Sequence, residues 1–154
     1  METVKVLTLE HFDSELPLPA YATAEAAGAD IRASLPLDIR SQGMVIGPGE
    51  RVLVPTGLAM EIPKGFEIQV RPRSGLSLKT DLLVVNSPGT IDSDYRGEVK
   101  IIIGNFGKSA FTVEHGERMA QLVLAPVIQA SFIVEGDLSQ TERGSGGFGS
   151  TGTK

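Results

Sequence analysis

Alternation of apolar and polar residues is the commonest pattern along the chain, and it predicts β-strands. In "GFEIQVRPRSG", Phe66 and Val70 fall on one face with Ile68, and polar residues fall on the other. The same period places Val99 and Ile103 together in "EVKIIIGNF". Further strand-like runs rich in β-branched residues are "METVKVLTLE", "RVLVPTGLAMEI" and "QLVLAPVIQASFIVE". These segments are interpreted as half-buried strands.

Turn signals separate the predicted strands at the spacing typical of an antiparallel sandwich or barrel. They are "IGPGE", "IPKG", "NSPG" and "EHGE". The chain has 18 Gly and 9 Pro but only 5% aromatic residues, which suits many short strands better than a helical bundle. One short helix is predicted in "SGLSLKTDL", with Ser74 as its N-cap. We therefore predict an all-β fold with one short helix.

Length and composition indicate one domain followed by a tail. A chain of 154 residues with 41% hydrophobic residues can fill one core. After Leu138 the sequence becomes "SQTERGSGGFGSTGTK", which has almost no apolar residues to bury. We therefore predict a folded domain over 1–138 and a flexible glycine-rich C-terminal arm over 139–154.

The net charge of −5 argues against general binding to nucleic acid, which requires a broad basic surface. A small anion held by a few arginines remains compatible with this charge. No apolar run is long enough to cross a bilayer, and the N-terminal segment lacks the basic start of a signal peptide. We expect a cytoplasmic protein that binds neither nucleic acid nor membrane.

Several chemistries are excluded by the residues themselves. The chain has no Cys, which removes disulfides, thiolate metal sites and a Cys nucleophile. His11 and His115 belong to no recognisable triad and are expected at the surface or in turns. An EF-hand-like start at Asp92 fails, because Arg96 replaces an oxygen ligand and Ile103 replaces the bidentate Glu.

Three segments remain as candidate sites. "NSPGTIDSDYRGEV" (86–99) places polar residues between two apolar runs, and by itself it suits a solvated turn as well as a site. In "RPRSGLS", Arg71 and Arg73 precede a predicted helix start and could grip an anion. The tail imitates nucleotide-binding glycine loops but lacks the strand and helix they need, and a linker does not explain Arg143 and Phe148 among its glycines.

Five segments taken in order resemble the five motifs of the homotrimeric dUTP diphosphatases, the dUTPases. They are "AGADIRA" (27–33), "PRSGLS" (72–77), "NSPGTIDSDYRGEV" (86–99), "GERMAQL" (116–122) and "RGSGGFGSTG" (143–152). Each motif alone is weak, but the ordered set spans nearly the whole chain. The resemblance implies a jelly-roll-like β-barrel or sandwich, and a homotrimer whose active sites are shared, with the arm typically supplied by a neighbour.

The resemblance also implies residue roles. The third motif would be a β-hairpin that receives uracil and deoxyribose, with Asn86 adding to backbone recognition of the base. Asp92 would hold the 3′-hydroxyl and act as general base toward water. The Tyr95 ring would pack under the sugar and exclude a 2′-hydroxyl. Further residues implied for this pocket are Gly89, Thr90, Ile91 and Lys100.

The remaining motifs would bind the phosphates. Asp30 would hold Mg²⁺ through water, consistent with the reluctance of this ion to lose its waters. Phe148 would stack on the uracil when the arm closes. Residues implied for phosphate and arm contacts are Arg73, Ser74, Gly75, Gln121, Arg143, Gly149, Ser150 and Thr151.

The implied reaction is attack of water on the α-phosphorus of dUTP, which yields dUMP and pyrophosphate. It would keep uracil out of DNA and supply dUMP for dTMP synthesis. Two alternatives stay open. One is dCTP deaminase on the same fold, although the region of its catalytic Glu here reads Thr90-Ile91-Asp92. The other is a non-catalytic jelly-roll binding protein.

Overall fold

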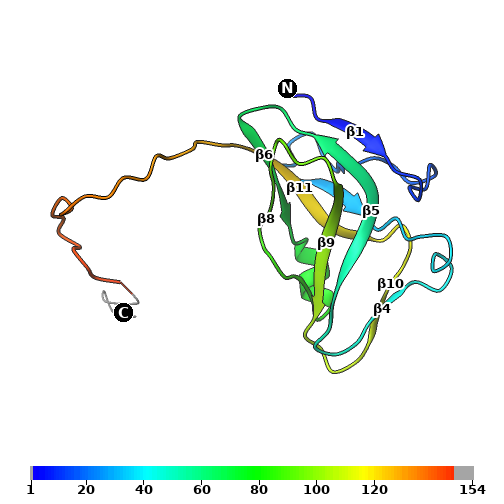
Figure 1. Cartoon of the computed structure of the whole chain (residues 1–154). Coiled ribbons are helices and arrows are strands. Elements are labelled where there is room, and N and C mark those ends of the chain that lie inside the picture. Colours follow the sequence, from blue (N-terminus) through cyan, green and yellow to red (C-terminus); the bar gives the residue numbers. More distant parts are fainter. Residues whose placement is uncertain (1, 148–154) are drawn as a thin grey trace.

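The computed structural model describes residues 2–147 and is nearly all-β in this range (Figure 1). Its elements are β1 (Lys5–Thr8), β2 (Ala20–Tyr21), β3 (Ala29–Arg32), β4 (Met44–Ile46), β5 (Arg51–Glu61), β6 (Phe66–Arg71), α1 (Ser74–Lys79), β7 (Leu82–Val84), β8 (Gly89–Ile91), β9 (Glu98–Asn105), β10 (Phe111–Val113) and β11 (Arg118–Pro126). The predicted all-β class with one short helix is confirmed.

The strands form two main sheets and one small sheet. The four-stranded sheet has the order β1-β5-β9-β7, and the five-stranded sheet has the order β2-β3-β11-β6-β8. Strands β10 and β4 form a separate pair. Neighbours far apart in sequence, such as β5 with β9 and β3 with β11, pair antiparallel. This arrangement of crossing connections is a jelly-roll-like sandwich.

The core fills the space between the sheets with the alternate residues that the sequence pattern predicted. Ile101 and Ile103 of β9 are completely buried, and Val99 is nearly so. Ile68 and Val70 of β6 are buried from the other sheet. The period of two therefore identified the inward face of both strands correctly.

Strand β5 carries a bulge where it pairs with β9. Pro55 is the partner of Lys100, and Ala59 is the partner of Glu98. The segment 56–58 therefore lies opposite a single residue of β9, which frees some of its N–H groups from the ladder. The bulge bends β5 beside the strand that carries the third motif.

Helix α1 begins one residue earlier than predicted. Arg73 occupies the N-cap position, with φ −95° and ψ 129°, and its side chain makes no capping bond. Ser74 is the first helical residue, so its prediction as N-cap was wrong. The Arg73 side chain instead reaches β3, where it contacts Asp30. Within the described part of the chain, no helix has the length and apolar character needed to cross a bilayer.

The last predicted strand ends earlier than the sequence pattern suggested. The run "QLVLAPVIQASFIVE" is a strand only to Pro126, and the prediction beyond this residue was wrong. Residues 127–138, here called the apolar extension, run away from the sandwich (Figure 1). Its side chains at Ile128, Phe132 and Val134 are almost fully exposed in the single chain. The division into 1–138 and 139–154 stays a prediction.

Replacing Gly57 in the bulge by Ala should destabilise the fold strongly. Gly57 has φ +67°, and a Cβ there would lie 2.8 Å from the Cα atom of Phe12. We expect a loss of about 2–5 kcal/mol in unfolding free energy, from left-handed strain together with overpacking. Urea unfolding of the purified protein would measure it.

Gly49→Ala is the matched control for Gly57→Ala. Gly49 has φ +73°, but nothing lies within 4 Å of its added Cβ. The unfolding free energy of this variant should fall only by the backbone strain, about 1–2 kcal/mol. Equal losses in the two variants would show that the contact with Phe12 contributes nothing.

Candidate active site

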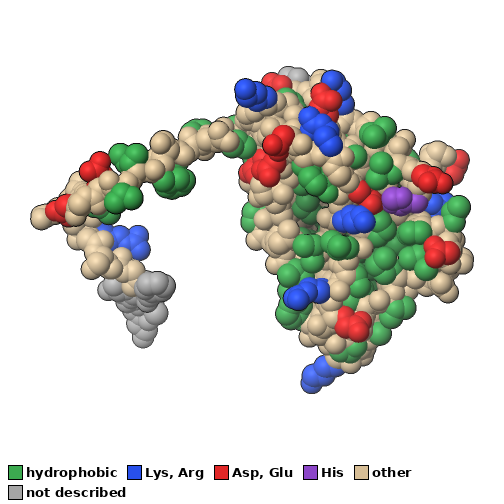
Figure 2. Space-filling model, in the orientation of Figure 1, with side chains coloured by type: hydrophobic (Ala, Val, Ile, Leu, Met, Phe, Trp, Pro, Cys, Tyr) green, Lys and Arg blue, Asp and Glu red, His purple; other side chains and the backbone are tan. Residues whose placement is uncertain are grey.

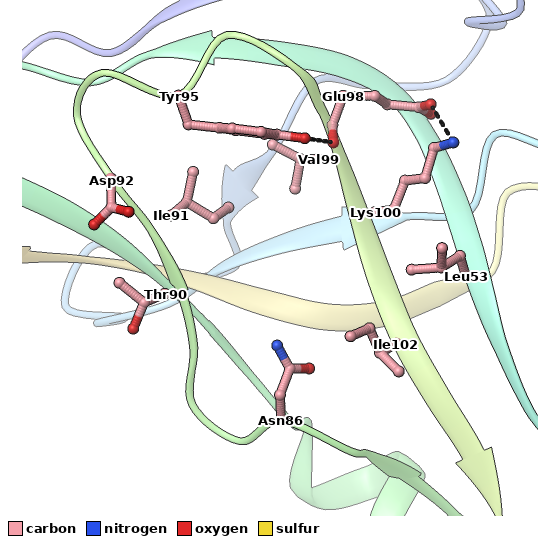
Figure 3. A pocket seen from close by; sticks show the side chains of 10 residues that line it. All are labelled: Leu53, Asn86, Thr90, Ile91, Asp92, Tyr95, Glu98, Val99, Lys100 and Ile102. Carbon is pink, nitrogen blue, oxygen red and sulfur yellow. Dashed lines mark hydrogen bonds and ion pairs between the residues drawn. The ribbon is translucent and has the colours of Figure 1, made fainter.

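A pocket of about 420 Å³ opens between β9 and the segment that runs from β8 toward it (Figure 3). It is lined by Leu53, Asn86, Thr90, Ile91, Asp92, Tyr95, Glu98, Val99, Lys100 and Ile102. The predicted residues among these are Asn86, Thr90, Ile91, Asp92, Tyr95 and Lys100, whose roles remain predictions. The sequence interpretation did not include Leu53, Glu98, Val99 or Ile102 in the site.

The pocket exists because the third motif passes from one sheet to the other. Strand β8 pairs with β6 in the five-stranded sheet, whereas β9 pairs with β5 and β7 in the four-stranded sheet. The two strands are not ladder partners, so the prediction of a β-hairpin was wrong. Since no ladder joins β8 to β9, the space between them is open to a ligand.

The connection between β8 and β9 is held by its own hydrogen bonds. The Tyr95 N–H donates to the Asp92 carbonyl at 3.1 Å, and the Arg96 guanidinium donates to the Ser93 carbonyl at 2.7 Å. The Tyr95 ring lies over Gly97, where an added Cβ would come within 3.0 Å of ring atom Cε2. Gly97 is therefore required for the position of the ring, although the sequence analysis did not name it.

Asp92 lies at the end of β8 with its carboxylate exposed. Among residues 2–147, no side chain donates a hydrogen bond to this carboxylate or forms an ion pair with it. Asn86 lies at the opposite end of the pocket in Figure 3. An added Cβ at Gly89 would be 3.0 Å from the Asn86 amide nitrogen, so Gly89 leaves room for that amide. The pocket thus offers an acceptor at one end and an amide at the other.

Glu98 is a half-buried carboxylate that lines the pocket, with a side chain only 11% exposed. Its Oε1 accepts from the Thr56 N–H at 3.1 Å, from the Gly57 N–H at 2.9 Å, and contacts His11 Nε2 at 2.8 Å. Its Oε2 lies 3.3 Å from the Lys100 ammonium. The N–H groups that the β5 bulge frees therefore find their acceptor in this carboxylate.

These contacts set the charge of Glu98. Burial by itself would raise the pKa of this carboxyl, but the hydrogen bond from Gly57 opposes it. Contacts with His11 and Lys100 act in the same direction, and the pKa of Glu98 ends below its usual value. The side chain is therefore a carboxylate at neutral pH.

The arginines of the second and fourth motifs form a separate group, here called the arginine cluster. Asp30 Oδ1 accepts from Arg73 Nε at 2.8 Å, and Oδ2 accepts from the Arg118 guanidinium at 3.0 Å. Arg73 also donates to the Arg118 carbonyl at 3.3 Å. The Gln121 amide donates to the Pro72 carbonyl at 2.9 Å. The sequence analysis missed Arg118, although "GERM" begins the motif that contains it.

The single chain does not bring the arginine cluster to the pocket. None of its residues lines the pocket. Strands β8 and β3 are separated in the sheet by β6 and β11, which corresponds to roughly 14 Å at about 4.8 Å per spacing. Ser74 and Gly75 are exposed at the start of α1 near Arg73. The predicted site residues therefore form two groups.

The arm residues lie apart from both groups. Arg143 is exposed, and its Nε donates to the Gly146 carbonyl at 2.8 Å within the arm itself. Figure 1 shows this part of the chain well away from the sandwich. The predicted contacts of Phe148, Gly149, Ser150 and Thr151 lie outside the described residues.

The sequence profile of the dUTPase family matches residues 14–152. The chain belongs to the dUTPase family. Its sequence is 56% identical over 150 residues to the deoxyuridine 5′-triphosphate nucleotidohydrolase of Roseobacter denitrificans, covering 97% of this chain and 96% of that protein. It is 57% identical over 145 residues to the protein of the same name from Chlamydia felis, covering 92% of this chain and 95% of that protein.

Solved dUTPase structures share the fold of this dUTPase-family chain. The dUTPase of Staphylococcus bacteriophage 80alpha with dUPNHPP superposes with a TM-score of 0.85 at 27% identity and covers 99% of both chains. A variant of the dUTPase from phage phi11 of S. aureus superposes with a TM-score of 0.73 at 23% identity, covering 88% of this chain and 98% of that one. That study describes the coordination of a structural Mg(II) ion in the phage protein.

Glu98 should make the stability of this dUTPase-family protein depend on acid pH. Its pKa in the folded protein lies below the ordinary value of 4.5. The stabilisation it confers is therefore complete above the unfolded-state pKa and is lost as pH falls through the lower folded-state pKa. Glu98→Gln should flatten the decline of unfolding free energy below about pH 4.5. Parallel declines in urea unfolding of wild type and variant would contradict this.

Proposed function

We propose that this protein hydrolyses dUTP to dUMP and pyrophosphate, by attack of water on the α-phosphorus. The observation that carries the proposal is the pocket between the two sheets, where Asn86, Asp92 and Tyr95 meet in a chain of the dUTPase family. The reaction keeps uracil out of DNA and supplies dUMP for dTMP synthesis. The protein carries out this reaction in the cytoplasm.

Asp92 is the proposed general base and the acceptor for the 3′-hydroxyl. Its exposed carboxylate, without a partner among the described side chains, is available to orient water and take a proton. The Tyr95 ring forms the wall that excludes a 2′-hydroxyl. Asn86 and the backbone from Gly89 to Ile91 recognise uracil, and Thr90 and Lys100 complete the pocket.

The arginine cluster is the proposed phosphate side of the site. Arg73 and Arg118 are held by a single carboxylate, so their guanidiniums are oriented before the nucleotide arrives. Arg73 acts there with Ser74, Gly75 and Gln121. The arm then closes over the nucleotide, and its proposed contacts come from Arg143, Phe148, Gly149, Ser150 and Thr151.

Mg²⁺ fits this site only through water. Each Asp30 oxygen already accepts from one guanidinium, which leaves lone pairs for metal-bound waters but no bare carboxylate for direct binding. Residues 2–147 contain no group of three or more acidic, His or Cys side chains placed to hold a metal. When bound, the ion would neutralise phosphate charge, while Asp30 would orient its waters.

We further propose a homotrimer with shared sites. Leu53 and Ile102 are cross-strand partners on the outer face of the four-stranded sheet, and Leu83, Val85 and Phe106 are exposed nearby. Figure 2 shows apolar side chains gathered on this side of the molecule. The face continues into the pocket, because Leu53 and Ile102 also line it. A second copy seated there would cover the apolar face and complete the site.

Turnover of a nucleotide panel tests the function. With Mg²⁺, the wild type should release pyrophosphate from dUTP, and far less from dCTP, dTTP or UTP. Asp92→Asn should lower kcat by about 10²–10⁴-fold, because the amide cannot accept a proton, while affinity for a non-hydrolysable dUTP analogue changes far less. Chelation of Mg²⁺ should also reduce turnover.

Asp94→Asn is the control, because Asp94 lies two residues away and does not line the pocket. It should leave kcat within a few-fold of wild type. Loss of turnover in Asp94→Asn with normal turnover in Asp92→Asn would reverse the two roles. Ammonia released from dCTP would identify a deaminase instead.

Mixing two inactive variants tests the shared site. Asp92→Asn and Arg73→Ala each remove one half of it. In randomly mixed trimers, about one quarter of the sites would combine an intact Asp92 with an intact Arg73 from different subunits. Joint refolding should therefore restore about a quarter of wild-type activity. If each site lay within one subunit, the mixture would be as inactive as its parents.

A further inference from the structure

Glu98 has a role that its place at the end of a turn does not suggest. The β5 bulge leaves the N–H groups of Thr56 and Gly57 without partners in the β5–β9 ladder. Both donate to Glu98 Oε1, at 3.1 and 2.9 Å. A buried N–H without an acceptor is costly, so this carboxylate locks the first residue of β9 to the bulge.

The backbone of the same residue holds the Tyr95 ring. The Tyr95 hydroxyl donates to the Glu98 carbonyl at 3.1 Å (Figure 3). The other bonds of the connection are internal to it, such as Tyr95 N–H to Asp92 and Arg96 to Ser93. The hydroxyl bond therefore ties the tip of the ring to β9.

Glu98 also places the cation of the pocket. Lys100 lies two residues further along β9, so its side chain leaves the strand on the same face. Its ammonium lies 3.3 Å from Glu98 Oε2. The positions of the Tyr95 ring and the Lys100 ammonium thus both depend on Glu98. The ring is held by the Glu98 carbonyl, and the ammonium is held by the Glu98 carboxylate.

We infer that Glu98 is a positioning residue that sets the discrimination between deoxyribose and ribose triphosphates. Its carboxylate fixes the start of β9 against the β5 bulge, and the fixed carbonyl of Glu98 holds the Tyr95 ring as a rigid wall. A wall excludes a 2′-hydroxyl only when it cannot move aside. The inference rests on the proposed function, since it requires a deoxyribose in this pocket.

A purely structural role for Glu98 would give a different kinetic result. Loss of folded protein lowers kcat/KM for dUTP and for UTP by the same factor, so their ratio does not change. A wall that has become loose admits UTP and lowers the ratio. The ratio of the two kcat/KM values therefore separates positioning from stability.

The experiment compares Glu98→Ala, which removes the acceptor of the two N–H groups, with Tyr95→Phe, which keeps the ring but removes its hydroxyl. In each variant the dUTP-to-UTP ratio of kcat/KM should fall by about threefold to tenfold, the factor that one hydrogen bond of ordinary net strength supplies. The ratio is the readout, because any fall in kcat that is common to the two substrates cancels in it. The double variant should lose no more selectivity than either single variant, because both act through one contact.

Glu50→Ala is the matched control. Its carboxylate also accepts a backbone N–H, from Gly47 at 2.8 Å, but in a turn that does not line the pocket. Its dUTP-to-UTP ratio should equal that of wild type. An unchanged ratio in Glu98→Ala, or additive losses in the double variant, would overturn the inference.

Two further outcomes are distinguishable. If Glu98→Ala does not fold, Tyr95→Phe still tests the hydroxyl contact, and an unchanged ratio there overturns the inference. If the wild type does not hydrolyse dUTP, the proposed function fails. The relative affinities of the variants for non-hydrolysable dUTP and UTP analogues then test Glu98 alone, and equal preference in wild type and variants overturns its role.

Discussion

Two backbone N–H groups in the β5 bulge need an acceptor, and the architecture around the pocket depends on that need. Without the Glu98 carboxylate, each group would be left unsatisfied at a cost of about 1–3 kcal/mol. The carboxylate meets both at once and joins β5 to β9 at the point where their register breaks. The junction positions the groups that β9 contributes to the pocket.

The two groups of site residues divide the chemistry of a nucleotide. The pocket between the sheets offers an amide, an aromatic ring and a carboxylate that has no partner among residues 2–147, which suit a base, a sugar and a water molecule. The arginine cluster offers guanidiniums already turned in one direction by Asp30. Incoming phosphate oxygens would compete with that carboxylate for the same donors. In the proposed trimer, the two groups would meet between subunits.

Much of the sandwich could be predicted from the sequence, because burial on one face imposes a period of two. Burial at Ile68, Ile101 and Ile103 follows directly from that rule. The polar run between two apolar strands did not by itself distinguish a site from a solvated turn. The ordered motifs, rather than any single residue, then identified the family.

The errors have physical causes. The run after Pro126 has strand propensity, but propensity does not tell whether the partner strand belongs to the same chain. Ser74 suits an N-cap, but the first helical hydrogen bonds, from the Leu76 and Ser77 N–H groups, go to the Arg73 carbonyl, one residue earlier. Glu98 was missed because a Glu beside a turn usually faces water. Only the register of β5 against β9 shows why this one is buried.

The apolar extension has a consequence for the handling and fate of the protein. From Val127 to Val134 it contains no charge, no Pro and no Gly, and it is rich in β-branched residues. Exposed segments of this composition readily stack into intermolecular β-sheets. A newly made single chain therefore carries a segment prone to aggregation. In the proposed trimer, rapid assembly would protect the protein from precipitation as well as complete its site.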